Sequence, residues 1–60
     1  MIFDNVKRIA HERGTTVSAV EKALGFGHGT IRCWKKGSPT VGKLKAVAEY
    51  LGTTIDELLK

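Results

Sequence analysis

The sequence predicts an all-α fold of five short helices in a single domain, and three observations lead to this prediction. Apolar residues recur three or four positions apart along most of the chain, which is the period of a helix. No stretch of useful length alternates between apolar and polar residues, as a half-buried strand would. The chain has 60 residues, of which 42% are hydrophobic, so it can bury one small core. We therefore expect one domain over residues 1–60.

The first two helices are predicted over residues 2–13 and 17–24. Their apolar residues at helical spacing are Ile2, Val6 and Ile9 in the first and Val17, Val20 and Leu24 in the second. Gly14 and Gly25 follow these patterns and can adopt the left-handed conformation in which many helices end. Thr15 and Thr16 carry hydroxyl groups that can cap the start of the second helix.

The third helix is predicted over residues 28–36, with the sequence HGTIRCWKK. Ile31 and Trp34 lie three apart, so they should share one side of this helix, which favours core packing of Trp34 over stacking on a base. Gly37 follows, and Pro39 cannot continue the helix because it lacks a backbone N–H. A turn over residues 37–39 is therefore expected.

The last two helices are predicted over residues 41–51 and 55–59. Thr40 is placed to cap the first of them, whose helical pattern consists of Val41, Leu44, Val47, Ala48 and Leu51, followed by Gly52. Thr54 and Glu57 have the spacing of a capping box, in which each side chain accepts a hydrogen bond from the other residue's backbone N–H. Two alternatives remain open for Leu58 and Leu59, which belong either to the core or to an interface with a partner.

Basic residues are concentrated in the middle of the chain. The net charge is +4, and no acidic residue occurs between Glu21 and Glu49, an interval that contains Lys22, Arg32, Lys35, Lys36, Lys43 and Lys45. A segment of one charge sign attracts an anionic partner and accelerates its capture. An ordinary solvated basic surface is the alternative interpretation of the same charges.

Three glycines, Gly25, Gly27 and Gly29, raise the question of a nucleotide-binding loop. Such a loop lies between a strand and a helix, whereas a predicted helix precedes these glycines. Thr30 stands where the third glycine of a dinucleotide fingerprint is required, and no Gly-Lys-Ser/Thr closes the stretch as in a P-loop. The glycines are better explained as the corner of a helix-turn-helix, with Gly29 leaving the first turn of the third helix bare for close approach of a DNA groove.

Two short helices joined by a glycine-containing turn, with cations on the second, are typical of a helix-turn-helix over about residues 17–36. The chain also resembles the phage repressor and Cro type of helix-turn-helix, called the XRE family, along nearly its whole length. The resemblance rests on Val20, Gly25, Phe26, Thr30, Ile31, Trp34, Gly37, Pro39, Leu44, Ala48, Leu51, Gly52 and the closing TTIDELL.

The resemblance implies five helices and a transcriptional regulator, a repressor above all, in the cytoplasm, associated with the nucleoid of a bacterium and encoded by it or by a phage. It also implies a homodimer, which can be weak without DNA, on a pseudo-palindromic operator in double-stranded DNA. The third helix would read bases in the major groove, with His28, Gly29, Arg32 and Cys33 at the family's base-contacting positions. Contacts with phosphates would come from Val17, Thr30, Lys36, Thr40, Gly42 and Lys43, and the charge of the segment adds Lys35 to this set.

Two positions depart from the family pattern. Val17 replaces a glutamine that commonly holds a phosphate, so a contact there would come from backbone N–H or be absent. Gly29 replaces a long amide that often reads bases, so discrimination would depend more on His28, Arg32 and the shape of the DNA. For Arg32, a guanine contact and a phosphate contact both remain open, because its planar fork suits either partner.

Other functional classes are less well supported by the sequence. No set of residues assembles a nucleophile, a base and an orienting group, so we do not expect an enzyme, and we expect no cofactor. His11, His28 and Cys33 lack the spacing of a metal site. Cys33 could contact a thymine methyl group, be a bystander, or be a thiol acidified by neighbouring cations. An antitoxin-like or other protein-interaction module is the alternative function.

The location of the protein can also be predicted from composition. The single Cys33 cannot form an internal disulfide, and the segment MIFDNVKR lacks the features of a secretory leader, so we expect an intracellular protein. No apolar stretch approaches the roughly 20 residues of a membrane span. We therefore expect no association with a membrane.

Overall fold

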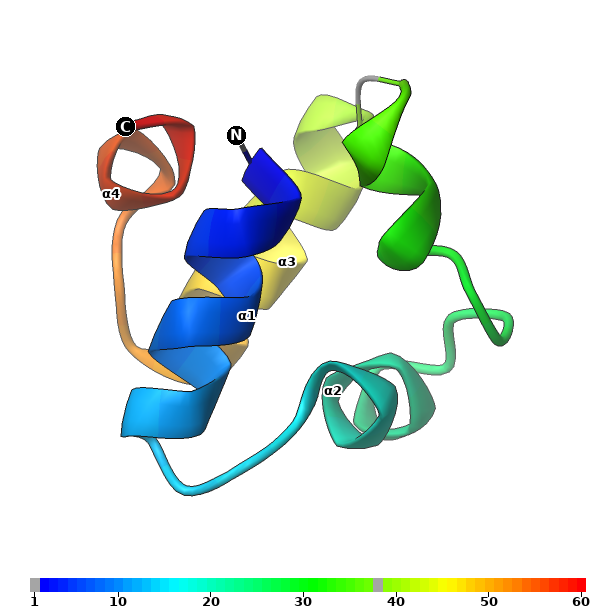
Figure 1. Cartoon of the computed structure of the whole chain (residues 1–60), viewed down its shortest axis with the longest axis horizontal. Coiled ribbons are helices and arrows are strands. Elements are labelled where there is room, and N and C mark those ends of the chain that lie inside the picture. The colour runs from blue at the N-terminus through cyan, green and yellow to red at the C-terminus, as the bar shows by residue number, and fades with distance from the viewer. Residues whose placement is uncertain (1, 38) are drawn as a thin grey trace.

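The computed structural model describes residues 2–37 and 39–60, and these residues form helices and turns without strands. The elements are α1 (Ile2–Glu12), α2 (Val17–Ala23), the 3-10 helix η1 (Arg32–Lys35), α3 (Val41–Leu51) and α4 (Ile55–Leu59). Helix α1 packs against each of the other elements, with α2 and η1 on one side of it and α4 on the other (Figure 1). The predicted all-α fold class is confirmed. No helix among the described residues has the length and apolar character needed to cross a membrane.

The core contains apolar residues from all five elements, which is why such short helices hold together. The largest fully buried side chains are those of Ile31, Leu58, Val6, Val20 and Val47. Around them lie Phe3, Ile9, Trp34, Leu44 and Leu51, each with at most 7% of its surface exposed. The helical spacing of apolar residues therefore identified the core. Leu58 is part of it, whereas Leu59 is 53% exposed, so the interface alternative is left to Leu59 alone.

Helices α2, α3 and α4 begin at the predicted residues. Thr16, Thr40 and Thr54 each accept a hydrogen bond from the backbone N–H three residues further on, at 3.1, 3.3 and 3.2 Å. Only this half of the predicted capping box is seen at Thr54, because the Glu57 carboxylate accepts from Lys60 Nζ at 3.1 Å instead of from the Thr54 N–H. Gly52 ends α3 in the left-handed conformation, with φ 71°. These local signals explain why the bounds of α2, α3 and α4 match the prediction so closely.

Two side chains of the α1 region fix its position against the C-terminal helices. Asn5 Nδ2 donates a hydrogen bond to the backbone carbonyl of Leu58 at 2.8 Å, and Arg13 Nε donates one to that of Leu51 at 2.8 Å. Both bonds join residues far apart in the sequence and satisfy carbonyl groups in the last turns of α4 and α3, which have no partner within their helices. Helix α1 is therefore held in a fixed orientation between α4 and the α2–η1 region.

The third predicted helix is much shorter than expected. Residues 28–31 form turns, and only Arg32–Lys35 are helical, as a 3-10 helix. Gly29 has φ 85°, which is outside the helical region, so it lies in the turn rather than in the first turn of a helix. The prediction of a helix over all of residues 28–36 is therefore wrong, and the described residues form four α-helices and one short 3-10 helix where five helices were expected.

Candidate nucleic-acid interface

The turn before η1 is held from inside the protein by Glu21 of α2. This residue is only 4% exposed. Its Oε1 accepts a hydrogen bond from the backbone N–H of Gly29 at 3.2 Å, and its Oε2 accepts one from that of Ile31 at 2.7 Å. Burying a carboxylate is costly unless it is hydrogen-bonded, and bonds to a charged acceptor are among the strongest in proteins. The two bonds therefore tie the start of η1 to α2.

The backbone of Gly29, with φ 85°, is outside the helical region, so the helical segment cannot extend through it. The N–H groups of Gly29 and Ile31 instead donate to Glu21, which holds the turn against α2. Ile31 precedes η1 without a side-chain cap, and Trp34 N–H donates to the Ile31 carbonyl at 2.9 Å in the tighter 3-10 pattern. The α2–η1 unit is thus a corner fixed by a buried acid, followed by a single tight turn of helix.

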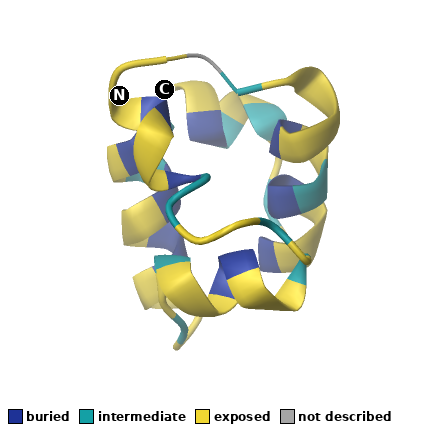
Figure 2. Cartoon of the chain, turned by 90° about the vertical axis from the view of Figure 1, so that its right-hand side faces the viewer, coloured by how far each residue is buried: buried dark blue, intermediate teal, exposed yellow. Residues whose placement is uncertain are grey.

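The side chains of η1 and of its two flanking residues divide into a buried set and an exposed set. Ile31 and Trp34 face the core, which confirms the packing role predicted for the tryptophan. The neighbouring residues Arg32, Cys33, Lys35 and Lys36 are all exposed. Figure 2 views the molecule from the side of α2 and η1 and shows exposed residues along much of this surface. Four predicted contact residues are therefore available to a partner.

The predicted residues gather around several open hollows. Thr30, Cys33, Thr40 and Lys43 line one of about 340 Å³, between the end of η1 and the start of α3. Gly29, Arg32, Cys33, Lys35 and Lys36 line another along the outside of η1. The first of these hollows places a helix start, with its unpaired N–H groups, beside a lysine, which is an arrangement suited to an anion.

His28 and Gly42 lie apart from these groups. His28 is exposed and lines a hollow with Ser18, Lys22 and Phe26 on the side of α2. Gly42 is exposed in the first turn of α3, and a Cβ built on it would meet no other atom within 4 Å. The structure thus separates His28 from Arg32 and Cys33, which the resemblance groups together as base-contacting residues.

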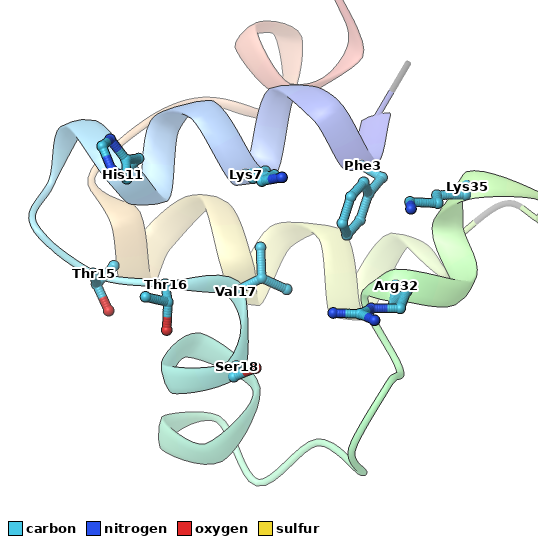
Figure 3. Close-up of a pocket in the computed structure, with 9 residues that line it drawn as sticks. All are labelled: Phe3, Lys7, His11, Thr15, Thr16, Val17, Ser18, Arg32 and Lys35. Atoms are coloured by element: carbon cyan, nitrogen blue, oxygen red, sulfur yellow. The ribbon is translucent and has the colours of Figure 1, made fainter.

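Another hollow, of about 330 Å³, lies between α1, the start of α2 and η1 (Figure 3). It brings Val17, Arg32 and Lys35 together with Lys7 and His11 of α1. Neither α1 residue was predicted to take part in binding. The basic segment starts at Lys22, and no local pattern connects it with α1, so only the tertiary fold indicates their proximity.

The exposed cations of this region lack acidic partners. The ion pairs formed among the described residues join Arg8 to Glu12 and Lys60 to Glu57, and both are largely exposed. Two lysines instead lie over aromatic rings, with Lys35 Nζ 4.8 Å from the ring centre of Phe3 and Lys43 Nζ 5.7 Å from that of Phe26. These contacts leave the lysine charges uncompensated, so the surface around η1 stays positive.

Comparison with known proteins agrees with this geometry. A family model described as a Cro/C1-type HTH DNA-binding domain matches residues 5–60. The match covers α2, η1 and α3 entirely and omits only the first residues of α1. No curated protein and no solved structure matches the chain significantly.

Proposed function

Because this chain belongs to the Cro/C1-type helix-turn-helix family of DNA-binding domains, we propose that it is a sequence-specific transcriptional repressor that binds an operator in double-stranded DNA. The observation that carries the proposal is the exposed basic surface around η1, where Arg32, Lys35 and Lys36 project next to a helix-turn-helix corner. Phosphate neutralisation by such cations supplies much of the affinity of DNA-binding proteins.

Base recognition is proposed for His28, Gly29 and Cys33, and for Arg32 as one of the two contacts, base or phosphate, that the sequence leaves open. Arg32 and Cys33 are exposed on η1, and His28 and Gly29 lie in the turn that leads into it. A guanidinium group can bond both major-groove acceptors of guanine, and an exposed thiol can contact a thymine methyl group. Gly29 has no side chain and lets the backbone approach the base edges.

Phosphate contacts are assigned to residues on both sides of this turn. Val17 would contribute through its backbone, whereas the side chains of Thr30, Lys35, Lys36 and Lys43 would contribute directly, and Thr40 and Gly42 would present the start of α3. The arrangement of Thr30, Thr40 and Lys43 around one hollow supports this assignment. A helix start with a lysine beside it offers a phosphate both N–H donors and a positive charge.

A homodimer on a pseudo-palindromic operator completes the proposal. Tyr50 and Leu59 are large apolar residues that are 49% and 53% exposed near the end of the chain, and they are available to a second copy. Two copies related by a two-fold axis would contact half-sites about 10 base pairs apart. A dimer contact made by two exposed side chains can be weak in the free protein. On DNA it strengthens, because the operator holds the two copies next to each other and raises their effective concentration.

Selection of bound sequences from random duplex DNA, followed by footprinting, tests the proposal. We expect an enriched pseudo-palindrome and two protected half-sites about one helical turn apart. Arg32→Ala should abolish binding to this sequence without unfolding the protein, because Arg32 is exposed. No enrichment, together with capture of a protein partner that Arg32→Ala leaves intact, would favour an antitoxin-like interaction module instead.

A further inference from the structure

We propose that the hollow between α1, the start of α2 and η1 holds a phosphate group of the DNA backbone, with Lys7 and His11 as additional ligands. This inference rests on the proposed DNA binding and extends the interface to α1. The hollow is the one that contains Lys7, His11, Arg32 and Lys35, and we call it the α1–η1 hollow (Figure 3).

The lining of the α1–η1 hollow has the chemistry of an anion site. Four of its residues carry basic side chains and none is acidic. Hydroxyl groups of Thr15, Thr16 and Ser18 lie along its opposite edge and can donate hydrogen bonds to phosphate oxygens. No carboxylate oxygen among the described residues lies within 4.0 Å of the four basic groups, so the charges of Lys7, Arg32 and Lys35 and the imidazole of His11 are available to an anion.

The basic groups converge from two elements. From η1, Lys35 extends toward Phe3 of α1 and Arg32 extends toward Val17 at the start of α2, and Lys7 and His11 project from α1 along the upper edge of the hollow (Figure 3). Lys35 is held there by the ring of Phe3, at 4.8 Å from Nζ to the ring centre. An anion between the two elements would relieve the mutual repulsion of cations that the fold brings together.

The exposure of the lining residues favours a DNA phosphate over a small free anion. Lys7, His11, Ser18, Arg32 and Lys35 are all exposed, so the hollow is an open groove. Sites for small ligands bury most of the ligand surface, which this groove does not. A phosphodiester in a duplex needs no such enclosure, because other contacts of the same molecule hold it in place.

This placement bears on the two alternatives for Arg32. Its guanidinium group extends into the α1–η1 hollow toward Val17, where it can contact the proposed phosphate. Arg32 would then position the duplex, while the remaining residues in and before η1 would read the sequence. The guanidinium fork matches two phosphate oxygens as well as it matches guanine.

The test is the salt dependence of DNA binding by Lys7→Gln, measured by fluorescence anisotropy with a labelled duplex of about 20 base pairs. Lys45→Gln is the matched control, because Lys45 is an exposed lysine of α3 outside the hollows described above. Each lost phosphate contact should lower the slope of log K against log salt by about 0.9. Between 50 and 200 mM salt, the fall in DNA affinity should therefore be about 3.5-fold smaller for Lys7→Gln than for the wild type.

The outcomes separate this inference from the proposed function. Failure of the wild type to bind duplex DNA would remove the proposed function itself. Binding by the wild type with equal slopes for Lys7→Gln and Lys45→Gln would overturn only the inference. Lys7→Arg should restore the wild-type slope, because it keeps the charge.

A second measurement distinguishes the source of the phosphate. Inorganic phosphate is titrated into the protein while backbone amide resonances of α1 and η1 are followed by NMR. Saturable shifts around Lys7 at sub-millimolar phosphate, together with an unchanged DNA slope for Lys7→Gln, would assign the hollow to a free anion and overturn the DNA assignment. Shifts around Lys7 on addition of duplex, lost in Lys7→Gln, would support it.

Discussion

Glu21 Oε2 accepts a hydrogen bond from the backbone N–H of Ile31 at 2.7 Å, and this bond joins the two halves of the helix-turn-helix. Both residues are buried, Glu21 to 4% exposure and Ile31 completely. A single acidic side chain of α2 thereby holds the turn that leads into η1. The exposed residues of η1 follow a turn held by a group that does not itself reach the surface.

Glu21→Gln should destabilise the protein although it preserves the size of the side chain. An amide offers one oxygen acceptor, so one of the N–H groups of Gly29 and Ile31 loses its partner and faces an NH₂ group. A buried donor without a partner costs about 1–3 kcal/mol. Urea denaturation measures the change, and Glu49→Gln, at an exposed residue of α3, is the control. An unchanged midpoint for Glu21→Gln would contradict the role assigned to this carboxylate.

Gly29→Ala and Gly42→Ala should shift stability in opposite directions. A Cβ at either position meets no atom within 4 Å, so sterics with neighbours do not decide the result. Gly29 has φ 85°, where a residue with a Cβ is strained by about 1–2 kcal/mol. Gly42 lies inside α3, where alanine is favoured by about 0.5–1 kcal/mol. Thermal unfolding of both variants gives the comparison, and stabilisation by Gly29→Ala would contradict the strained turn.

Arg32→Lys distinguishes a phosphate contact from a base contact. Lysine keeps the charge and loses the planar fork, so a phosphate contact should survive with little change in the ratio of specific to non-specific affinity. Loss of a two-bond contact with guanine would instead reduce the free-energy difference between specific and non-specific binding by about 1–3 kcal/mol. Anisotropy titrations with the selected operator and a scrambled duplex measure the ratio. From the position of Arg32 in the α1–η1 hollow we expect the first result.

Thr40→Ala should destabilise α3 by about 1 kcal/mol, because the Lys43 N–H loses the hydroxyl oxygen it bonds at 3.3 Å. Thr40→Ser keeps that oxygen and should remain close to the wild type. Denaturant titration followed by circular dichroism reports the difference. Equal stability of the two variants would mean that water replaces the cap without cost.

Much of the fold follows from local patterns in the sequence. The caps at Thr16, Thr40 and Thr54 and the apolar spacing between them place α2, α3 and α4, because the hydrogen bonds involved join residues only three apart. The segment over 28–36 was mispredicted, because the same apolar spacing of Ile31 and Trp34 fits a 3-10 helix as well as an α-helix. The contact from Glu21 that holds the turn before η1 joins residues ten apart in the sequence, so no local pattern indicates it.

The candidate site was predictable in part for the same reason. The resemblance supplied the contact positions on η1 and at the start of α3, and the charge distribution supplied Lys35. Lys7 and His11 escaped both kinds of reasoning, because their approach to Arg32 exists only after α1 packs against η1. Residues contributed by a distant element require the tertiary structure.

The exposed side chains of η1 carry none of the bonds that hold the corner together, since those bonds run from Glu21 to main-chain N–H groups. Exchange of Cys33 or Lys36 for another residue therefore leaves the scaffold intact. Under the proposed function, base-contacting side chains such as that of Cys33 can therefore change without loss of the fold. The same independence makes these positions suitable for combinatorial libraries that retarget the protein.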